Sequence, residues 1–174
     1  MDLPQPDWQK QLRRDELILQ LSRVLTPAQV IHRAEDLIVY ECDALSAYRQ
    51  LPMAVVLPAS TDQVAAAVRG CAGLEIPIIP WGAGTGLSGG ALARQDGVVI
   101  SLAGMNRILD IDLNNGTATV EPGVTNLAVS NAVADAGFYY APDPSSQLAC
   151  TIGGNIAENS GGVHCLKYGT TTNN

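Results

Sequence analysis

Pro80-Trp81-Gly82-Ala83-Gly84-Thr85-Gly86-Leu87-Ser88-Gly89-Gly90 is the most glycine-rich stretch of the chain, with five glycines in the nine residues 82–90. It directly follows a predicted strand, residues 76–80. Glycines let the backbone turn sharply and remove side chains that would block a close ligand. Consecutive bare N–H groups then form a concave anion site suited to a pyrophosphate, and Thr85 and Ser88 add hydroxyl groups. The alternative interpretation is a surface loop between two strands.

Within this stretch, Gly84-Thr85-Gly86-Leu87-Ser88-Gly89 fits the dinucleotide pattern G-x-G-x-x-G. That pattern needs a crossover helix of about a dozen residues before the next strand. Only residues 91–96 separate the loop from the next predicted strand, residues 97–102, and no acidic residue follows that strand at the required distance. We therefore exclude nicotinamide binding on a doubly wound parallel sheet.

A second glycine cluster, Thr151-Ile152-Gly153-Gly154-Asn155-Ile156-Ala157-Glu158-Asn159-Ser160-Gly161-Gly162, follows the turn-forming segment Pro142-Asp143-Pro144-Ser145-Ser146. Paired glycines allow close backbone approach, and the two asparagines offer both donors and acceptors. A flat heterocycle with N–H and C=O edges, such as an isoalloxazine ring, suits that mixture. A pair of tight turns is the structural alternative.

Composition separates the chain into two parts. All 17 glycines lie after residue 69, whereas the first 49 residues hold 14 of the 27 charged side chains. We expect a helical arm, residues 1–48, followed by a glycine-rich domain, residues 49–174. Hydrophobic residues make up 47% and charged residues 16% of the chain, which is a globular balance. A net charge of −7 without a basic stripe argues against nucleic acid and anionic lipid as partners.

Targeting and metal signals are not evident in the sequence. The N-terminus has no apolar signal-peptide core, and no apolar run reaches the ~20 residues of a membrane span. The four cysteines form no Cys-x-x-Cys pair, so neither a disulfide framework nor a metal site is predicted. We expect a cytoplasmic protein.

Periodicity predicts the regular elements. Helices are expected around residues 17–25, after Pro27, after a Ser60/Gln63 capping box, and over residues 125–136 up to Gly137. Strands are expected over residues 55–57, 76–80, 97–102, 108–113 and 117–121, with Asn114-Asn115-Gly116 as a hairpin turn. Residues 139–174 read mostly as turns.

Five segments resemble, in order and spacing, the FAD domain of the vanillyl-alcohol oxidase / p-cresol methylhydroxylase flavoproteins. They are Pro80 to Gly90, Glu121-Pro122-Gly123, Pro142 to Ser146, Thr151 to Gly162 and Lys167-Tyr168-Gly169. The resemblance runs from about Glu35 to the last residue. Tyr40-Glu41-Cys42-Asp43-Ala44-Leu45-Ser46-Ala47-Tyr48-Arg49 and His164 to Gly169 are similar to the branch of glycolate, D-lactate and D-2-hydroxyglutarate dehydrogenases, above all the D-type flavin subunits of bacterial glycolate oxidases.

The resemblance implies an α+β fold: a p-cresol methylhydroxylase-type FAD-binding domain of two α+β subdomains with FAD between them. It would be preceded by the short helical arm and truncated at the C-terminus, without the cap domain. The implied cofactor-binding residues are Pro80, Gly82, Ala83, Gly84, Thr85, Gly86, Leu87, Ser88, Gly89 and Gly90 for the pyrophosphate. Those implied for the ribityl chain and flavin are Pro122, Gly123, Pro142, Asp143, Ser145, Ser146, Thr151, Gly153, Gly154, Asn155, Asn159, Gly161, Gly162, Tyr168 and Gly169.

The implied reaction is hydride transfer from a short 2-hydroxy acid to FAD, with glycolate giving glyoxylate and electrons passing to a partner or a quinone. The alternatives are a D-lactate or D-2-hydroxyglutarate dehydrogenase, or a non-catalytic FAD-binding subunit or fragment. The resemblance implies that the family's substrate-binding and metal-binding residues lie in the rest of the FAD domain and in the cap domain, beyond the residues given, so none is assigned here and the isolated chain is expected to be inactive. Implied partners are flavin- and iron–sulfur-type subunits of a glycolate oxidase complex, which would also provide any association with the inner membrane.

Covalent flavin attachment is not expected. Some relatives bond FAD through a histidine in the first glycine loop, and residues 80–90 contain none. Cys150 lies near the position of a flavin thioether in others but is offset, so a buried structural cysteine is favoured. Cys42, Cys71 and Cys165 are also expected to be structural. His164 adjoins the flavin cluster, where a local structural role is favoured over contact with flavin or substrate.

Overall fold

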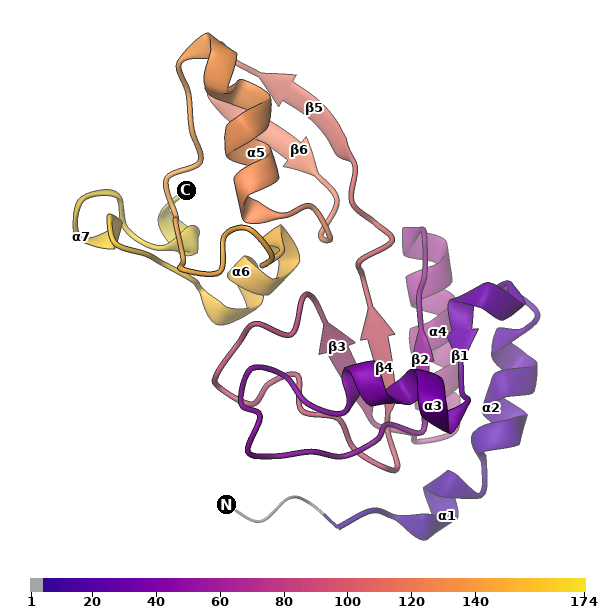
Figure 1. The fold of residues 1–174 in the computed structure, drawn as a ribbon. Helices are drawn as coiled ribbons and strands as arrows, with labels where there is room; N and C mark the ends of the chain where they lie inside the picture. The colour runs from indigo at the N-terminus through magenta and orange to yellow at the C-terminus, as the bar shows by residue number, and fades with distance from the viewer. Residues whose placement is uncertain (1–4) are drawn as a thin grey trace. The chain divides into compact units, whose positions relative to one another are not determined.

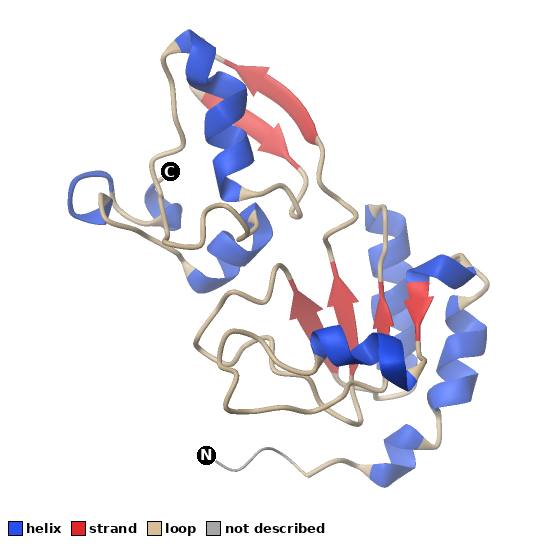
Figure 2. Cartoon of the chain, viewed as in Figure 1, coloured by secondary structure: helices blue, strands red, loops and turns tan. Residues whose placement is uncertain are grey.

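The computed structural model describes residues 5–174 and shows a mixed α+β chain (Figures 1 and 2). It forms two compact units, Met1–Leu102 (unit 1) and Ala103–Asn174 (unit 2). Two α+β units agree with the predicted fold. No helix in the described part of the chain is long and apolar enough to cross a bilayer.

Unit 1 is built on a four-stranded sheet with the order β1-β2-β4-β3. Its strands are β1 (Val30–Ile31), β2 (Ala54–Val56), β3 (Ile78–Trp81) and β4 (Val98–Ser101). The last three are parallel, and β1 pairs antiparallel with β2. All residues of β2 and β4 are buried, because apolar side chains cover both faces of these two strands.

Unit 1 also contains helical segments (Figure 1). They are α1 (Trp8–Gln11), α2 (Arg14–Leu21), η1 (Pro27–Gln29), α3 (Ala34–Leu37), η2 (Ile38–Tyr40) and α4 (Thr61–Gly73). The predicted start of α4 is confirmed, since the Ser60 side chain accepts from the N–H of Gln63. Helix α2 ends at Leu21, earlier than the periodicity to residue 25 predicts.

The predicted helical arm contributes to the core of unit 1. Leu17, Leu21 and Leu25 are buried in the same cluster as Ala54 and Val56 of strand β2. In the described chain the break between compact units lies at Leu102/Ala103. The boundary between residues 48 and 49 stays a prediction.

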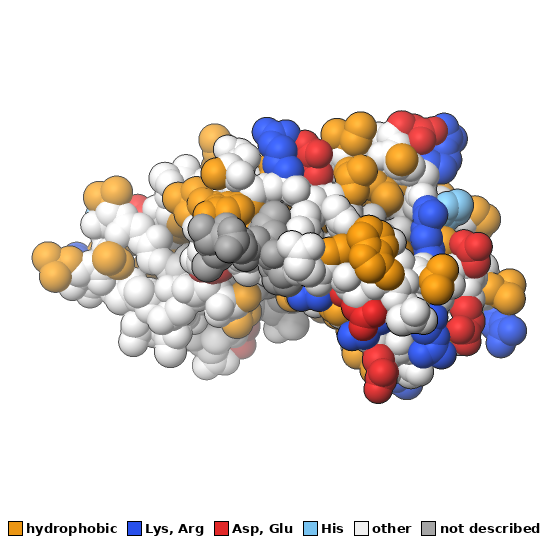
Figure 3. All heavy atoms as spheres, turned by 90° about the horizontal axis from the view of Figure 1, so that it is seen from below, with side chains coloured by type: hydrophobic (Ala, Val, Ile, Leu, Met, Phe, Trp, Pro, Cys, Tyr) orange, Lys and Arg blue, Asp and Glu red, His pale blue; other side chains and the backbone are white. Residues whose placement is uncertain are grey.

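On the face shown in Figure 3, acidic and basic side chains are interspersed over unit 1 and few lie over unit 2.

Unit 2 begins with an antiparallel hairpin, β5 (Ile108–Asp112) and β6 (Thr117–Val120). The predicted turn is confirmed: Asp112 Oδ1 accepts from the N–H groups of Asn114 and Asn115, and Gly116 has φ +63°. Its helices are α5 (Asn126–Val133), η3 (Ala134–Ala136), α6 (Ile152–Glu158), α7 (Cys165–Tyr168) and η4 (Thr171–Asn173). The predicted stop at Gly137 is also confirmed, with φ +79°.

The expectation that residues 139–174 are mostly turns is wrong for α6. The Thr151 side chain accepts from the N–H of Gly154 and caps this helix, and Asn159 ends it at φ +49°. Glycine is a poor helix former, so the pair Gly153-Gly154 argued against a helix in the sequence. The cap and the tertiary contacts stabilise the helix despite these two glycines.

Candidate functional site

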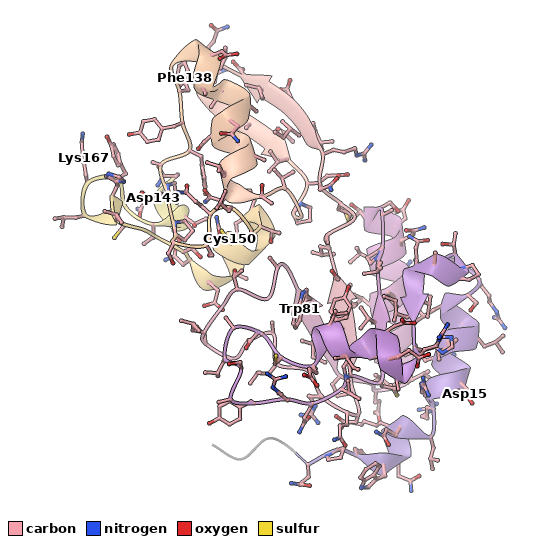
Figure 4. All side chains as sticks on the ribbon, viewed as in Figure 1. Asp15, Trp81, Phe138, Asp143, Cys150 and Lys167 are labelled. Carbon is pink, nitrogen blue, oxygen red and sulfur yellow. The ribbon has the colours of Figure 1, made fainter. Side chains whose placement is uncertain are left out.

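The glycine loop, residues 82–90, follows strand β3 in unit 1 and starts the helix-free connection from β3 to its parallel neighbour β4. Gly84 and Gly89 have φ +66° and +79°, a left-handed conformation that favours glycine. A Cβ atom on Gly84 would lie 2.5 Å from Cζ2 of Trp81, whose side chain is buried beside the loop (Figure 4). Both the backbone angle and the space therefore demand glycine at position 84.

The loop presents unused backbone donors. In the described chain, the five N–H groups of residues 83–87 donate to no backbone carbonyl. The loop is partly to fully exposed and contains no acidic side chain. Successive N–H groups without flanking bulk or negative charge are suited to an oxyanion.

A segment before β2 packs against this loop. The N–H of Ala44 donates to the carbonyl of Gly84 at 2.8 Å, and the ring of Tyr40 contacts the ring of Trp81 edge-on at 5.5 Å. Asp43, in the same segment, is buried. Reasoning from sequence missed these neighbours of the loop, because nothing in the spacing of Tyr40 to Arg49 indicates where that segment packs.

Three of the predicted residues in unit 2 meet where two segments pair. The N–H of Gly153 donates to the carbonyl of Pro122 at 2.9 Å, and Thr151 forms an antiparallel bridge with Thr125. A Cβ atom on Gly153 would lie 2.9 Å from Cβ of Pro122. Glycine at position 153 thus permits the close approach of the two segments.

A second group in unit 2 forms around Asp143 (Figure 4). Its Oδ2 lies 2.6 Å from Nδ1 of His164, and its Oδ1 accepts from the N–H of His164 at 3.3 Å. The hydrogen bond from His164 lowers the pKa of Asp143. A Cβ atom on Gly162 would lie 2.1 Å from the carbonyl oxygen of Asp143. His164 thereby has a structural partner in the segment 142–146.

The two predicted asparagines have different surroundings. Asn155 is buried, and its Nδ2 has no hydrogen-bond partner among the described residues. Asn159 is engaged: its Oδ1 accepts from the N–H and the hydroxyl of Thr172 at 3.0 and 2.6 Å.

Of the remaining predicted residues of unit 2, Gly154 lies in α6, Tyr168 lies in α7, and the others lie in loops. Tyr168 packs edge-on against Tyr139 with ring centres 6.0 Å apart, and Lys167 Nζ lies 4.7 Å from the Tyr168 ring centre. Pro142 is buried and accepts from the side chain of Asn126. The others are Gly123, Ser145, Ser146, Gly154, Gly161 and Gly169, of which Ser145 is exposed.

The cysteines differ in accessibility. Cys71 and Cys150 are buried, as expected of structural cysteines. Cys165 is exposed and Cys42 is half-buried, so the structural role expected of these two cysteines stays a prediction. Cys165 lies on the four-residue helix α7, none of whose residues is buried. No cluster of three potential metal-ligating His, Cys, Asp or Glu side chains occurs in residues 5–174.

The family described as FAD binding domain matches residues 52–174, which is most of the chain. The chain belongs to the p-cresol methylhydroxylase-type FAD-binding domain family. This membership implies FAD as the cofactor of the domain.

Curated relatives of this FAD-binding domain include the glycolate oxidase subunit GlcD of Escherichia coli strain K12, 52% identical over 161 residues. GlcD of Bacillus subtilis strain 168 is 44% identical over 152 residues, and a D-2-hydroxyglutarate dehydrogenase of Xanthomonas citri pv. viticola is 36% identical over 157. These matches cover 92%, 87% and 90% of this chain but only 32%, 32% and 33% of the relatives. The chain therefore spans about a third of their length.

Solved structures support the fold of the domain. An alkyldihydroxyacetonephosphate synthase matches with a TM-score of 0.80 at 24% identity, over 97% of this chain and 35% of that one. A p-cresol methylhydroxylase matches with a TM-score of 0.69 at 20% identity, over 84% of this chain and 29% of that one. At these identities the likeness concerns the fold alone.

Proposed function

We propose that this chain is the FAD-binding part of a flavoprotein that oxidises a short 2-hydroxy acid, with glycolate as the substrate and glyoxylate as the product. The observation that carries the proposal is the 52% identity to a glycolate oxidase subunit over 92% of the chain. The glycine loop and the second glycine cluster both lie within the matched family region.

The glycine loop fits the pyrophosphate of FAD. The five unused N–H groups of residues 83–87 supply donors, and residues 80–90 carry no acidic side chain that would repel the phosphates. At the far end of the β3–β4 connection, Asp96 is neutralised by Arg94 at 2.9 Å. The loop residues assigned to the pyrophosphate are Pro80, Gly82, Ala83, Gly84, Thr85, Gly86, Leu87, Ser88, Gly89 and Gly90.

The flavin and its ribityl chain are assigned to unit 2. Asn155 supports this assignment, because a buried amide nitrogen without a partner is an unmet donor that a carbonyl-bearing ligand would satisfy. The other unit 2 residues assigned are Pro122, Gly123, Pro142, Asp143, Ser145, Ser146, Thr151, Gly153, Gly154, Asn159, Gly161, Gly162, Tyr168 and Gly169. Attachment is non-covalent: the glycine loop has no histidine, and Cys150 is buried.

Bound FAD supplies the two-electron acceptor that converts a 2-hydroxy acid to a 2-oxo acid. The residues of this chain bind and orient it. The groups that remove the hydroxyl proton and hold a metal are assigned to the part of the protein corresponding to the remaining two thirds of the relatives, so the isolated chain is inactive in this proposal.

The word "subunit" in the names of the GlcD relatives supports partners for the complete protein. We assign it to a cytoplasmic complex with flavin- and iron–sulfur-type subunits, which pass the electrons onward and provide any link to the inner membrane. A second candidate function is supported by the identity to dehydrogenases of D-2-hydroxyglutarate, 36%, and of D-lactate, 42% over 120 residues.

The substrate is tested on the complete protein purified with its flavin. Under anaerobic conditions, glycolate, D-lactate and D-2-hydroxyglutarate are added separately and the bleaching of the oxidised flavin band is followed. Glycolate is expected to reduce the flavin fastest. Faster reduction by either of the other acids would contradict glycolate as the substrate, and a purified protein unable to bind FAD would contradict the flavoprotein assignment itself.

A further inference from the structure

The segment Tyr40 to Leu45 forms the base of the glycine loop, and the proposed function gives it no role. Contacts join the two both directly and through the Trp81 side chain of strand β3. Ala44 donates its N–H to the Gly84 carbonyl at 2.8 Å, Tyr40 packs against Trp81, and Trp81 occupies the space beside Gly84. In addition, Leu45 Cδ2 lies 3.6 Å from where a Cβ of Gly89 would be. Both glycines of the loop with positive φ therefore rest on this segment.

Asp43 holds that segment in shape. Its Oδ1 accepts from the N–H of Leu45 at 2.8 Å, which closes a turn over residues 43–45. That turn directs the intervening N–H of Ala44 to the glycine loop. The residue is 5% exposed, so it lies beneath the surface rather than in solvent.

The other oxygen of Asp43 is unusual. Asp43 Oδ2 is buried and has no hydrogen-bond partner among the described residues, and the carboxylate makes no ion pair with a described residue. An unpaired buried carboxylate oxygen is costly, and such groups in native proteins usually have a partner in the functional state. This oxygen lies in the segment that contacts the loop assigned to FAD.

We propose that Asp43 is a positioning residue for the glycine loop. Its Oδ1 stabilises the turn that contacts Gly84, and its Oδ2 accepts a hydrogen bond from an N–H or O–H group that becomes available when FAD is bound. The inference rests on the assignment of the loop to the pyrophosphate. It gives the Tyr40 to Arg49 motif a function, which is to fix the conformation of the loop from below.

The test compares Asp43→Asn with wild type in the complete protein. Asparagine keeps an oxygen for the Leu45 N–H but replaces the second oxygen by a donor, with almost no change in shape. The probe is FAD added to the flavin-free protein, followed by quenching of flavin fluorescence. A buried hydrogen bond to the second carboxyl oxygen is at stake, so we expect FAD to bind about tenfold or more weakly.

A matched control is Asp36→Asn, which makes the same chemical change on an exposed carboxylate of unit 1. Its FAD affinity is expected to stay at the wild-type value. Melting temperatures of the flavin-free proteins give the second readout. The proposal predicts that Asp43→Asn leaves this temperature unchanged, and that turnover is restored at saturating FAD.

Three outcomes are informative. Wild-type FAD affinity in Asp43→Asn would overturn the role of Asp43, and so would a melting temperature that falls equally in the flavin-free and the FAD-loaded protein. If wild type itself binds no FAD, the proposed function fails instead, and the two failures are thus distinguishable.

Discussion

Replacing Gly84 by alanine tests the geometry of the glycine loop. The new methyl group would meet the buried Trp81 ring at 2.5 Å, and the ring is held from its edge by Tyr40. Alanine at φ +66° costs about 1–2 kcal/mol. Overpacking against the ring adds about 1–3 kcal/mol. The free energy of unfolding of the flavin-free complete protein should therefore fall by about 2–5 kcal/mol.

Gly116→Ala is the control for this substitution. Gly116 has nearly the same angle, φ +63°, but a Cβ there has no neighbour within 4 Å. It should cost only about 1–2 kcal/mol, without loss of FAD affinity. Urea unfolding measures the free energy of unfolding of both variants, provided that their m-values equal that of the wild type. Equal losses for Gly84→Ala and Gly116→Ala would refute the contact between the loop and Trp81.

Three further predictions concern accessibility, charge and packing. Burial raises the pKa of the Cys71 thiol to about 11, so near neutral pH an alkylating reagent should modify exposed Cys165 first, as mass spectrometry would show; equal rates would contradict the burial. Glu121 forms an ion pair with Arg107, whose guanidinium nitrogen lies 2.7 Å from a carboxylate oxygen of Glu121. The hydrogen bond from Arg107 lowers the pKa of Glu121, so this carboxylate contributes stability at neutral pH that is lost as the pH falls from about 4.5 through the lowered value. Melting temperatures of wild type and Glu121→Gln should therefore differ at neutral pH and converge in acid, and a constant difference would count against the ion pair. Gly162→Ala would place a methyl group 2.1 Å from the carbonyl oxygen of Asp143 and should cost about 3 kcal/mol or more in urea unfolding; a neutral effect would show that the two segments do not pack so closely.

The sequence predicts elements that are defined by local chemistry. Ser60 caps α4, Asn114 to Gly116 form the hairpin turn, and Gly137 ends the helical segment α5–η3. Each of these features could be predicted because it depends only on neighbouring residues. The glycine loop belongs to the same class, since its glycines and the strand before it lie in one stretch.

Long-range packing explains what the sequence did not reveal. Helix α6 depends on the pairing of Gly153 with Pro122, which no local pattern indicates. The spacing of Leu17 and Leu21 predicts a helix in the N-terminal arm. Their burial in the same cluster as residues of β2 depends on a contact distant in sequence, which the spacing does not indicate. The sequence does not indicate that Asp43 is buried in the segment that contacts the glycine loop.

The central claim, that the glycine loop holds the pyrophosphate of FAD, is tested most directly by amide hydrogen exchange. The complete protein is measured with and without FAD, and exchange is followed in peptides that cover residues 82–90. The account predicts fast exchange of the N–H groups of residues 83–87 without FAD and strong protection with it, because these donors have no backbone acceptor in the free chain. Exchange at residues 83–87 that FAD leaves unchanged, while other parts of the protein become protected, would contradict it.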